Sequence, residues 1–232
     1  MKIAEGLDVL ELGSEERRMN ATLIWDDKNV ILIDAGLPGQ LENIREEVEK
    51  AGVSFDRINK IIITHHDLDH IGSLSSIVKN SKSEIEVLAH SGERPYIEGD
   101  KIGIKITPER LSSMPESMKE TIKQLKTKVN RVVKDEEELS YCGGIEVIYT
   151  PGHTPGHICL YLKKYKALVT GDAMNVVNDE LIGPNPEYTF DMKQAIESLK
   201  KLTKYDIETV ICYHGGVFTR SSNDRIAKLA NS

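Results

Sequence analysis

Short runs of apolar residues alternate along this chain with stretches in which apolar residues recur every three or four positions. A short continuous apolar run predicts a buried strand, and the wider spacing predicts an amphipathic helix. Strands are expected at 21–25, 30–33, 60–64, 86–89, 144–149, 158–162, 167–170 and 209–213. Helices are expected at 41–51, 71–79, 191–202 and over the last ten residues. Such alternation of strands and helices indicates an α/β fold.

Residues 91–135 depart from this alternation and predict a helical insertion. Apolar residues there fall at helical steps of four, three and four: Met118, Ile122, Leu125 and Val129. Pro115 suits the first turn of such a helix. Because no low-complexity linker separates this stretch from the rest, we expect residues 1–232 to form one domain with an insertion.

The charge and the length of the apolar runs argue against nucleic acids and membranes as partners. Lys and Arg number 30 against 37 Asp and Glu in 232 residues, so the formal net charge is −7. General nucleic-acid binding is disfavoured, because it relies on basic patches that neutralise phosphates. No apolar run reaches the roughly 20 residues of a membrane-spanning helix, and the first residues lack a signal-peptide stretch, so we expect no membrane partner and a cytoplasmic protein. Three cysteines without CxxC spacing predict buried free thiols: Cys142, Cys159 and Cys212.

Histidine and aspartate residues stand directly after four of the expected strands. They occupy the loop from His65 to His70 and the loops that begin with His153, Asp172 and His214. Loops that leave rigid strands are common places for functional sites. A single histidine at a strand end is most often a hydrogen-bonded surface residue, but four such loops together favour a metal site built from imidazole and carboxylate ligands.

The first of these loops reads His-His-Asp-Leu-Asp-His, from His65 to His70. Side chains two residues apart point the same way in extended backbone, so His65, Asp67 and Asp69 are expected to converge. His70 joins them if the chain begins to turn. His66 then faces elsewhere, although its replacement of Asp67 as a ligand stays open as an alternative.

These motifs resemble those of the metallo-β-lactamase-fold hydrolases. That family has a first motif His-x-His-x-Asp-His, followed by a His, an Asp and a final His. The matching segments are 64–70, Gly152-His153-Thr154-Pro155-Gly156-His157, Thr170-Gly171-Asp172 and His214-Gly215-Gly216, and Asp34-Ala35-Gly36 resembles the family's early Asp-x-Gly turn. The resemblance covers about residues 7–216 and implies a four-layered αββα sandwich.

The resemblance also implies two divalent metal ions, with zinc expected and manganese or iron as alternatives. By the family's pattern, one metal takes His65, Asp67 and His153, and the other takes Asp69, His70 and His214, with Asp172 bridging. Asp69 and Asp172 are given catalytic roles, orienting the attacking water and passing on its proton. One departure is Asp67, where the family usually has His. Three carboxylates give this ligand set a charge of −3 in place of −2, which favours harder metals.

The activity that the resemblance implies is hydrolysis by a hydroxide that bridges the two metals. The family includes β-lactamases, thioester hydrolases, lactonases, ribonucleases and iron oxidoreductases, and the fold does not choose among them. We expect the substrate to be an ester, thioester or lactone of an intracellular small molecule. An iron-dependent oxidoreductase and a β-lactam hydrolase are the alternatives.

Several remaining side chains receive weaker interpretations. His157 is expected to hold the loop of His153 in place rather than to bind metal, and His90 to cap the end of its strand. Lys119, Lys123 and Lys126 form a stripe on the expected insertion helix. That stripe either contacts an anionic group of the substrate or is a solvated face, in which case the apolar side packs on the core or on a second copy in a homodimer.

Overall fold

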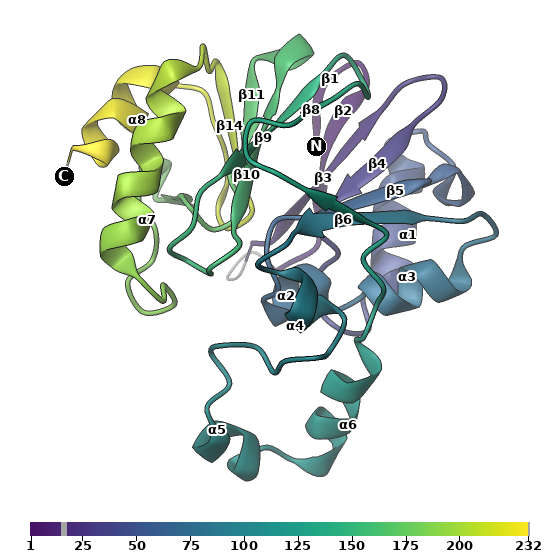
Figure 1. Ribbon diagram of the computed structural model, residues 1–232. Helices are drawn as coiled ribbons and strands as arrows, with labels where there is room; N and C mark the ends of the chain where they lie inside the picture. Colours follow the sequence, from purple (N-terminus) through teal and green to yellow (C-terminus); the bar gives the residue numbers. More distant parts are fainter. Residues whose placement is uncertain (15–17, 232) are drawn as a thin grey trace.

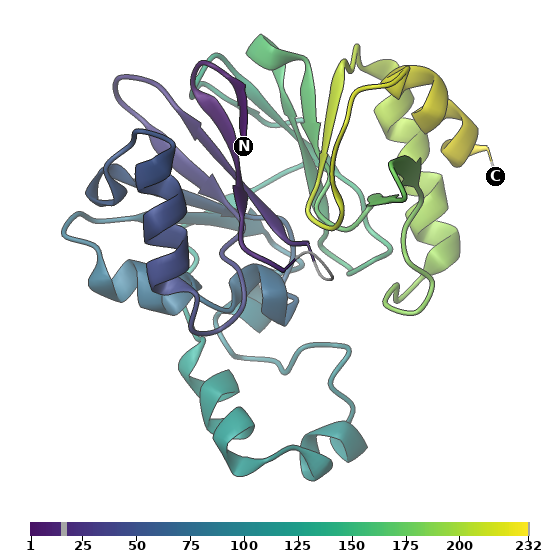
Figure 2. The ribbon, with the colours of Figure 1, turned by 180° about the vertical axis from the view of Figure 1, so that it is seen from behind.

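The protein is described here by a computed structural model that covers residues 1–14 and 18–231. Within these ranges, two β-sheets pack face to face, and helices cover the outer face of each (Figures 1 and 2). The first sheet contains, in spatial order, β1 (Lys2–Ala4), β2 (Leu7–Glu11), β3 (Asn20–Trp25), β4 (Val30–Ile33), β5 (Lys60–Ile63), β6 (Glu86–His90) and β7 (Arg131–Val133). The second contains β15 (Gly216–Phe218), β14 (Thr209–Cys212), β11 (Ala167–Val169), β10 (Ile158–Leu162), β9 (Ile145–Tyr149) and β8 (Glu138–Leu139).

The remaining elements cover the sheets or connect them. Helices α1 (Leu41–Lys50) and α3 (Leu74–Asn80) lie on the first sheet, and α7 (Met192–Leu199) and α8 (Ser222–Ala230) lie on the second (Figure 1). The shorter elements are α2 (Leu68–Ile71), α4 (Arg94–Ile97), α5 (Pro108–Ser113), α6 (Glu116–Gln124), the hairpin of β12 (Asn175–Val177) and β13 (Glu180–Ile182), and 3₁₀ turns at Phe55–Arg57, Lys163–Tyr165 and Lys200–Lys204. In the described ranges, no helix is long and apolar enough to cross a bilayer.

Three apolar layers hold this arrangement together. Ile61 of β5 packs with Ile44 of α1 on the outer side of the first sheet. Its neighbour Ile62 points to the opposite face, because side chains alternate along a strand, and it packs with Leu160 of β10 between the sheets. A third layer lies between the second sheet and its helices. The predicted αββα sandwich is therefore confirmed, as are the predicted strands and the helices that cover them.

The insertion between β6 and β7 differs from its prediction in two ways. β7 pairs in parallel with β6, so residues 131–133 belong to the first sheet rather than to the insertion. The predicted helix through Val129 is also wrong at its end, because α6 stops at Gln124, and the segment 125–130 belongs to no helix. In that segment Leu125, Thr127 and Val129 are buried and the residues between them are exposed. Because Leu125 and Val129 are four positions apart, this period of two looks like helical spacing in the sequence. Helices α5 and α6 project from the end of the sandwich in both views (Figures 1 and 2).

Candidate metal centre

The candidate site lies where four strands end at one edge of the sandwich. β10 is antiparallel to both β9 and β11, and β11 is parallel to β14, so β9, β11 and β14 finish at the same edge. The end of β5 joins them there, because the backbone N–H of Ile158 donates to the carbonyl of Thr64 at 3.1 Å. The loops that follow these four strands carry the predicted histidines and aspartates.

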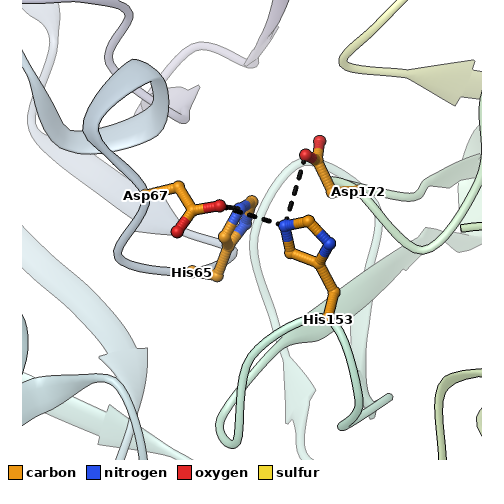
Figure 3. Close-up of side chains that lie close together, drawn as sticks. All are labelled: His65, Asp67, His153 and Asp172. Carbon is orange, nitrogen blue, oxygen red and sulfur yellow. Dashed lines mark hydrogen bonds and ion pairs between the residues drawn. The ribbon is translucent and has the colours of Figure 1, made fainter. Parts of the chain in front are cut away.

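The seven predicted ligand residues come together in two groups at this edge. The groups are His65, Asp67, His153 and Asp172, and Asp69, His70 and His214, and the potential ligand atoms within each lie within 4.8 Å of one another. Figure 3 shows the carboxylates of Asp67 and Asp172 directed at the same ring nitrogen of His153. That the two groups hold two metals stays a prediction.

Asp172 lies between the two groups. Its Oδ2 is 3.4 Å from Nε2 of His153 in the first group and 3.5 Å from Nε2 of His214 in the second. Its Oδ1 is 3.3 Å from Nε2 of His70, also in the second group. This is the position that a bridging carboxylate requires.

Three buried atoms of the site make no hydrogen bond of good geometry among the described residues: Nε2 of His65, Nε2 of His70 and Oδ1 of Asp172. They do face neighbours, because Nε2 of His65 lies 3.3 Å from Oδ2 of Asp67 and Nε2 of His70 lies 3.3 Å from Oδ1 of Asp172. Buried polar atoms in folded proteins are nearly always paired, so their convergence needs an explanation. Imidazole nitrogens and carboxylate oxygens are the ligands that zinc, manganese and iron accept. The residues present therefore fit divalent metal ions.

Supporting hydrogen bonds aim the histidine rings. The Nδ1 of His70 lies 2.9 Å from Oδ2 of Asp34, and the Nδ1 of His65 lies 3.0 Å from Oγ1 of Thr64. Asp34 accepts two further bonds, from the backbone N–H of Thr64 at 2.9 Å and from its hydroxyl. A histidine held through Nδ1 presents Nε2 to a metal, so the early Asp-x-Gly turn orients the second group.

Burial and neighbouring charges shift the histidine pKa values of the two groups in opposite directions. Burial lowers the pKa of His65, and the charge of His70 lowers it further. Burial also opposes protonation of His70, but Asp34 and Asp172 outweigh it and hold the pKa of His70 well above its usual value. For His214, hydrogen bonds to Asp172 and Asp69 overcome burial and raise the pKa to about 9. Metal binding in the second group would therefore displace protons.

His157 lies outside both groups and acts on the loop of Asp172. Its Nδ1 lies 2.9 Å from Oγ1 of Thr150, and its Nε2 accepts the backbone N–H of Asp172 at 3.1 Å. Burial lowers the pKa of His157 to about 3, so its ring stays neutral and its Nε2 stays an acceptor. Gly171 allows this approach, because a Cβ there would lie 2.7 Å from Nε2 of His157.

His66 also lies outside the two groups, and Asp67 takes the place in the first group for which His66 was the alternative. The ring of His66 stacks on Tyr96 with 4.0 Å between centroids, and its Nδ1 meets Oε2 of Glu93. His90 accepts the N–H of Gly92 at 3.2 Å, a contact of the capping kind expected for it.

Glu93 is a site residue that the sequence analysis missed. Its carboxylate is fully buried and accepts the backbone N–H of His66 at 2.8 Å and of Gly156 at 2.6 Å. The hydroxyl of Thr154 donates to it at 2.7 Å. Glu93 thus ties the loop of Asp67 to the loop of His153. No motif marks it, because its partners belong to two distant segments.

Lys105 is a second residue that the sequence analysis missed. It comes from the insertion, and its ammonium group contacts Oδ2 of Asp67 and lies 2.7 Å from Nε2 of His153. A lysine within a charged, irregular stretch carries no signal of this placement. The contact joins the insertion to the first ligand group.

Comparison with known protein families agrees with this geometry. The family model described as the metallo-beta-lactamase superfamily matches residues 16–214. The chain belongs to this superfamily. The match includes every predicted ligand residue, and the superfamily binds divalent metals. The chain is thus a member of a family of enzymes.

Individual relatives align with most of the length of this chain. It is 29% identical over 216 residues to the "Probable metallo-hydrolase YflN" of Bacillus subtilis, covering 87% of this chain and 81% of that protein. It is 28% identical over 220 residues to the "Hydroxyacylglutathione hydrolase GloC" of Haemophilus influenzae, covering 93% and 94%. The solved structure of the metallo-beta-lactamase family protein TTHA1429 from Thermus thermophilus superposes with a TM-score of 0.77 at 21% identity, covering 99% of this chain and 80% of that one. This likeness shows the shared fold.

Proposed function

We propose that the protein is a dinuclear metal-dependent hydrolase that cleaves an ester, thioester or lactone bond of a small molecule in the cytoplasm. The observation that carries the proposal is the placement of Asp172 between two groups of ligand atoms. Two divalent ions held there would activate water for attack on a carbonyl carbon at neutral pH. Zinc is the proposed metal, with manganese and iron as the alternatives.

The chain's own residues supply orientation and proton transfer in this proposal. Asp69 and Asp172 orient the attacking water and pass its proton to the leaving group. Their carboxylates remain ionised at neutral pH: burial opposes ionisation, but the hydrogen bond from His214 lowers the pKa of Asp69, and the charge of His70 lowers that of Asp172. Asp34 and His157 hold the loops on which these groups lie.

The relatives support the thioester part of the proposed substrate class. A hydroxyacylglutathione hydrolase, by its name, releases an acyl group from the thiol of glutathione, and a relative with that name matches nearly the full length of this chain. The fold alone does not select among acyl substrates.

The test combines metal analysis with a substrate screen. Protein purified without added metal is analysed for zinc, manganese and iron, and then assayed on ester, thioester, lactone, β-lactam and phosphodiester substrates. We expect two divalent ions per chain, and an ester, thioester or lactone activity that Asp172→Ala abolishes and Asp27→Ala, at an exposed position, retains. Bound iron with oxygen consumption and no hydrolysis would favour the oxidoreductase alternative and overturn the proposal.

A further inference from the structure

A cavity of about 290 Å³ lies between the insertion and the end of the sandwich. Its wall is largely apolar and draws on α2, α4, α5, α6 and the segment between α4 and α5. Representative apolar side chains are Ile71, Tyr96, Ile106, Leu111 and Ile122. The volume lies near the lower end of small-molecule sites, which run from ~300 to 1,000 Å³. It suits a medium-length acyl chain or one aromatic ring.

The cavity and the metal centre share part of their walls. Leu68 lines the cavity and stands in the chain between Asp67 and Asp69, one from each ligand group. On the insertion side, Gly103 and Ile106 line the cavity, and Lys105 between them reaches the first ligand group. The walls of the cavity and of the metal centre are therefore built from neighbouring residues of the same two chain segments.

Lysine dominates the charge on the cavity wall. Lys101, Lys119, Lys123 and Lys126 all line it, and no acidic residue is among its described lining residues. The formal charge of the whole chain is −7, so this is a local reversal of sign. Lys119 and Lys123 do form ion pairs on α6, each 2.7 Å long, with Glu116 and Glu120. Such exposed pairs contribute only ~0–1 kcal/mol, so a bound anion displaces them readily.

We propose that this cavity is the substrate-binding site and that the substrate is an acyl compound with an anionic group. The apolar acyl part occupies the cavity, and the negative group lies against Lys119, Lys123 and Lys126. This inference rests on the proposed function, since it names the substrate class of the same metal centre. It gives the lysine stripe its role as an anion contact, in place of a solvated helix face.

Direct binding tests the cavity without relying on turnover. Calorimetry measures the dissociation constants of butyrate, hexanoate, octanoate and the uncharged octanol for the protein as purified. Each added methylene is expected to tighten binding by up to about fourfold, the gain from burying one such group. Octanoate is expected to bind at least tenfold more tightly than octanol. Equal affinity for butyrate and octanoate would overturn the apolar part of the proposal.

Variants assign the binding to this cavity. Ile122→Trp and, independently, Leu111→Trp fill the space and are expected to weaken octanoate binding at least tenfold, whereas Gln124→Trp, exposed on the same helix, leaves it unchanged. The triple change of Lys119, Lys123 and Lys126 to Gln is expected to weaken octanoate but not octanol. The matched control changes Lys28, Lys79 and Lys193, which are exposed and lie outside the insertion. Unchanged octanoate binding in both Trp variants, with unfolding curves that show folded protein, would overturn the proposal.

Hydrolysis provides the separate readout for the metal centre. We expect Ile122→Trp to lower the ratio of kcat/KM for p-nitrophenyl octanoate to that for p-nitrophenyl acetate at least tenfold, because only the longer chain reaches into the cavity, whereas Gln124→Trp leaves the ratio as in the parent. Chain-length-dependent binding without hydrolysis of any ester, thioester or lactone would leave the cavity assigned and overturn the proposed function. If Ile122→Trp instead hydrolyses the octanoate and acetate esters with the same preference as the parent, the proposed function would stand and the assignment of the cavity as the substrate-binding site would be overturned.

Discussion

The ammonium group of Lys105 lies against the carboxylate of Asp67 and 2.7 Å from Nε2 of His153. Asp67 stands where the family's usual pattern has His, so it adds one negative charge to the predicted ligand set. Lys105 supplies one positive charge at that same carboxylate. The insertion, through Lys105, thus neutralises the extra negative charge that Asp67 brings to the predicted ligand set.

Removal of the Lys105 ammonium is expected to strengthen metal uptake by the first group. A divalent ion that binds Asp67 and His153 has to displace the ammonium from both, at the cost of a charge-assisted contact of ~1.5–3 kcal/mol. Lys105→Met should therefore bind zinc at this group about tenfold more tightly or more, in competition with a chromogenic chelator. Lys101→Met, which lines the cavity nearby, is the control. Equal or weaker zinc affinity in Lys105→Met would contradict this reading of the contact.

The identity of residue 67 is expected to set metal preference. Oxygen ligands suit harder metals, and imidazole suits zinc. In a medium that supplies zinc, manganese and iron together, Asp67→His should therefore hold a larger share of zinc than the parent protein. Elemental analysis of the two proteins after identical purification measures this share. The same metal content in both would show that Asp67 does not govern selection.

Glu93 is expected to be a major source of stability for the two ligand loops. Its loss would strand the buried N–H groups of His66 and Gly156 and the hydroxyl of Thr154, each at ~1–3 kcal/mol. Glu93→Ala should lower the free energy of unfolding by about 3–5 kcal/mol in urea denaturation. Glu93→Gln keeps one acceptor oxygen and should lose less. Glu187→Ala, at an exposed position, should stay within ~0.5 kcal/mol of the parent. If Glu93→Ala also lowered the free energy of unfolding by no more than ~0.5 kcal/mol, the proposed structural role of Glu93 would be refuted.

The sequence predicted those parts of the site that are encoded locally. The alternation predicted that His65 and Asp67 converge while His66 lies outside both groups, as the structure has it. The alternation does not extend to Asp69, because α2 begins at Leu68 and Asp69 joins His70 in the second group. Glu93 and Lys105 escaped prediction because their partners lie far away in sequence. Glu93 binds Gly156, 63 positions away, and Lys105 contacts His153, 48 positions away. Such pairs depend on how the insertion packs against the loops, which no local spacing records.

The three cysteines are expected to be unreactive in the folded protein. All are buried, and burial raises the thiol pKa of Cys142, Cys159 and Cys212 to about 12. An unfolded thiol has a pKa of ~8.5, so the stability that follows from keeping these thiols neutral is complete below pH ~8 and falls as the pH rises above it. At pH 8, a thiol-exchange reagent such as dithiobis(nitrobenzoic acid) should react with fewer than one thiol per folded chain within minutes and with all three in urea. Rapid reaction of a native thiol would place that cysteine at an accessible, activated position, and Cys→Ser variants would identify which one it is.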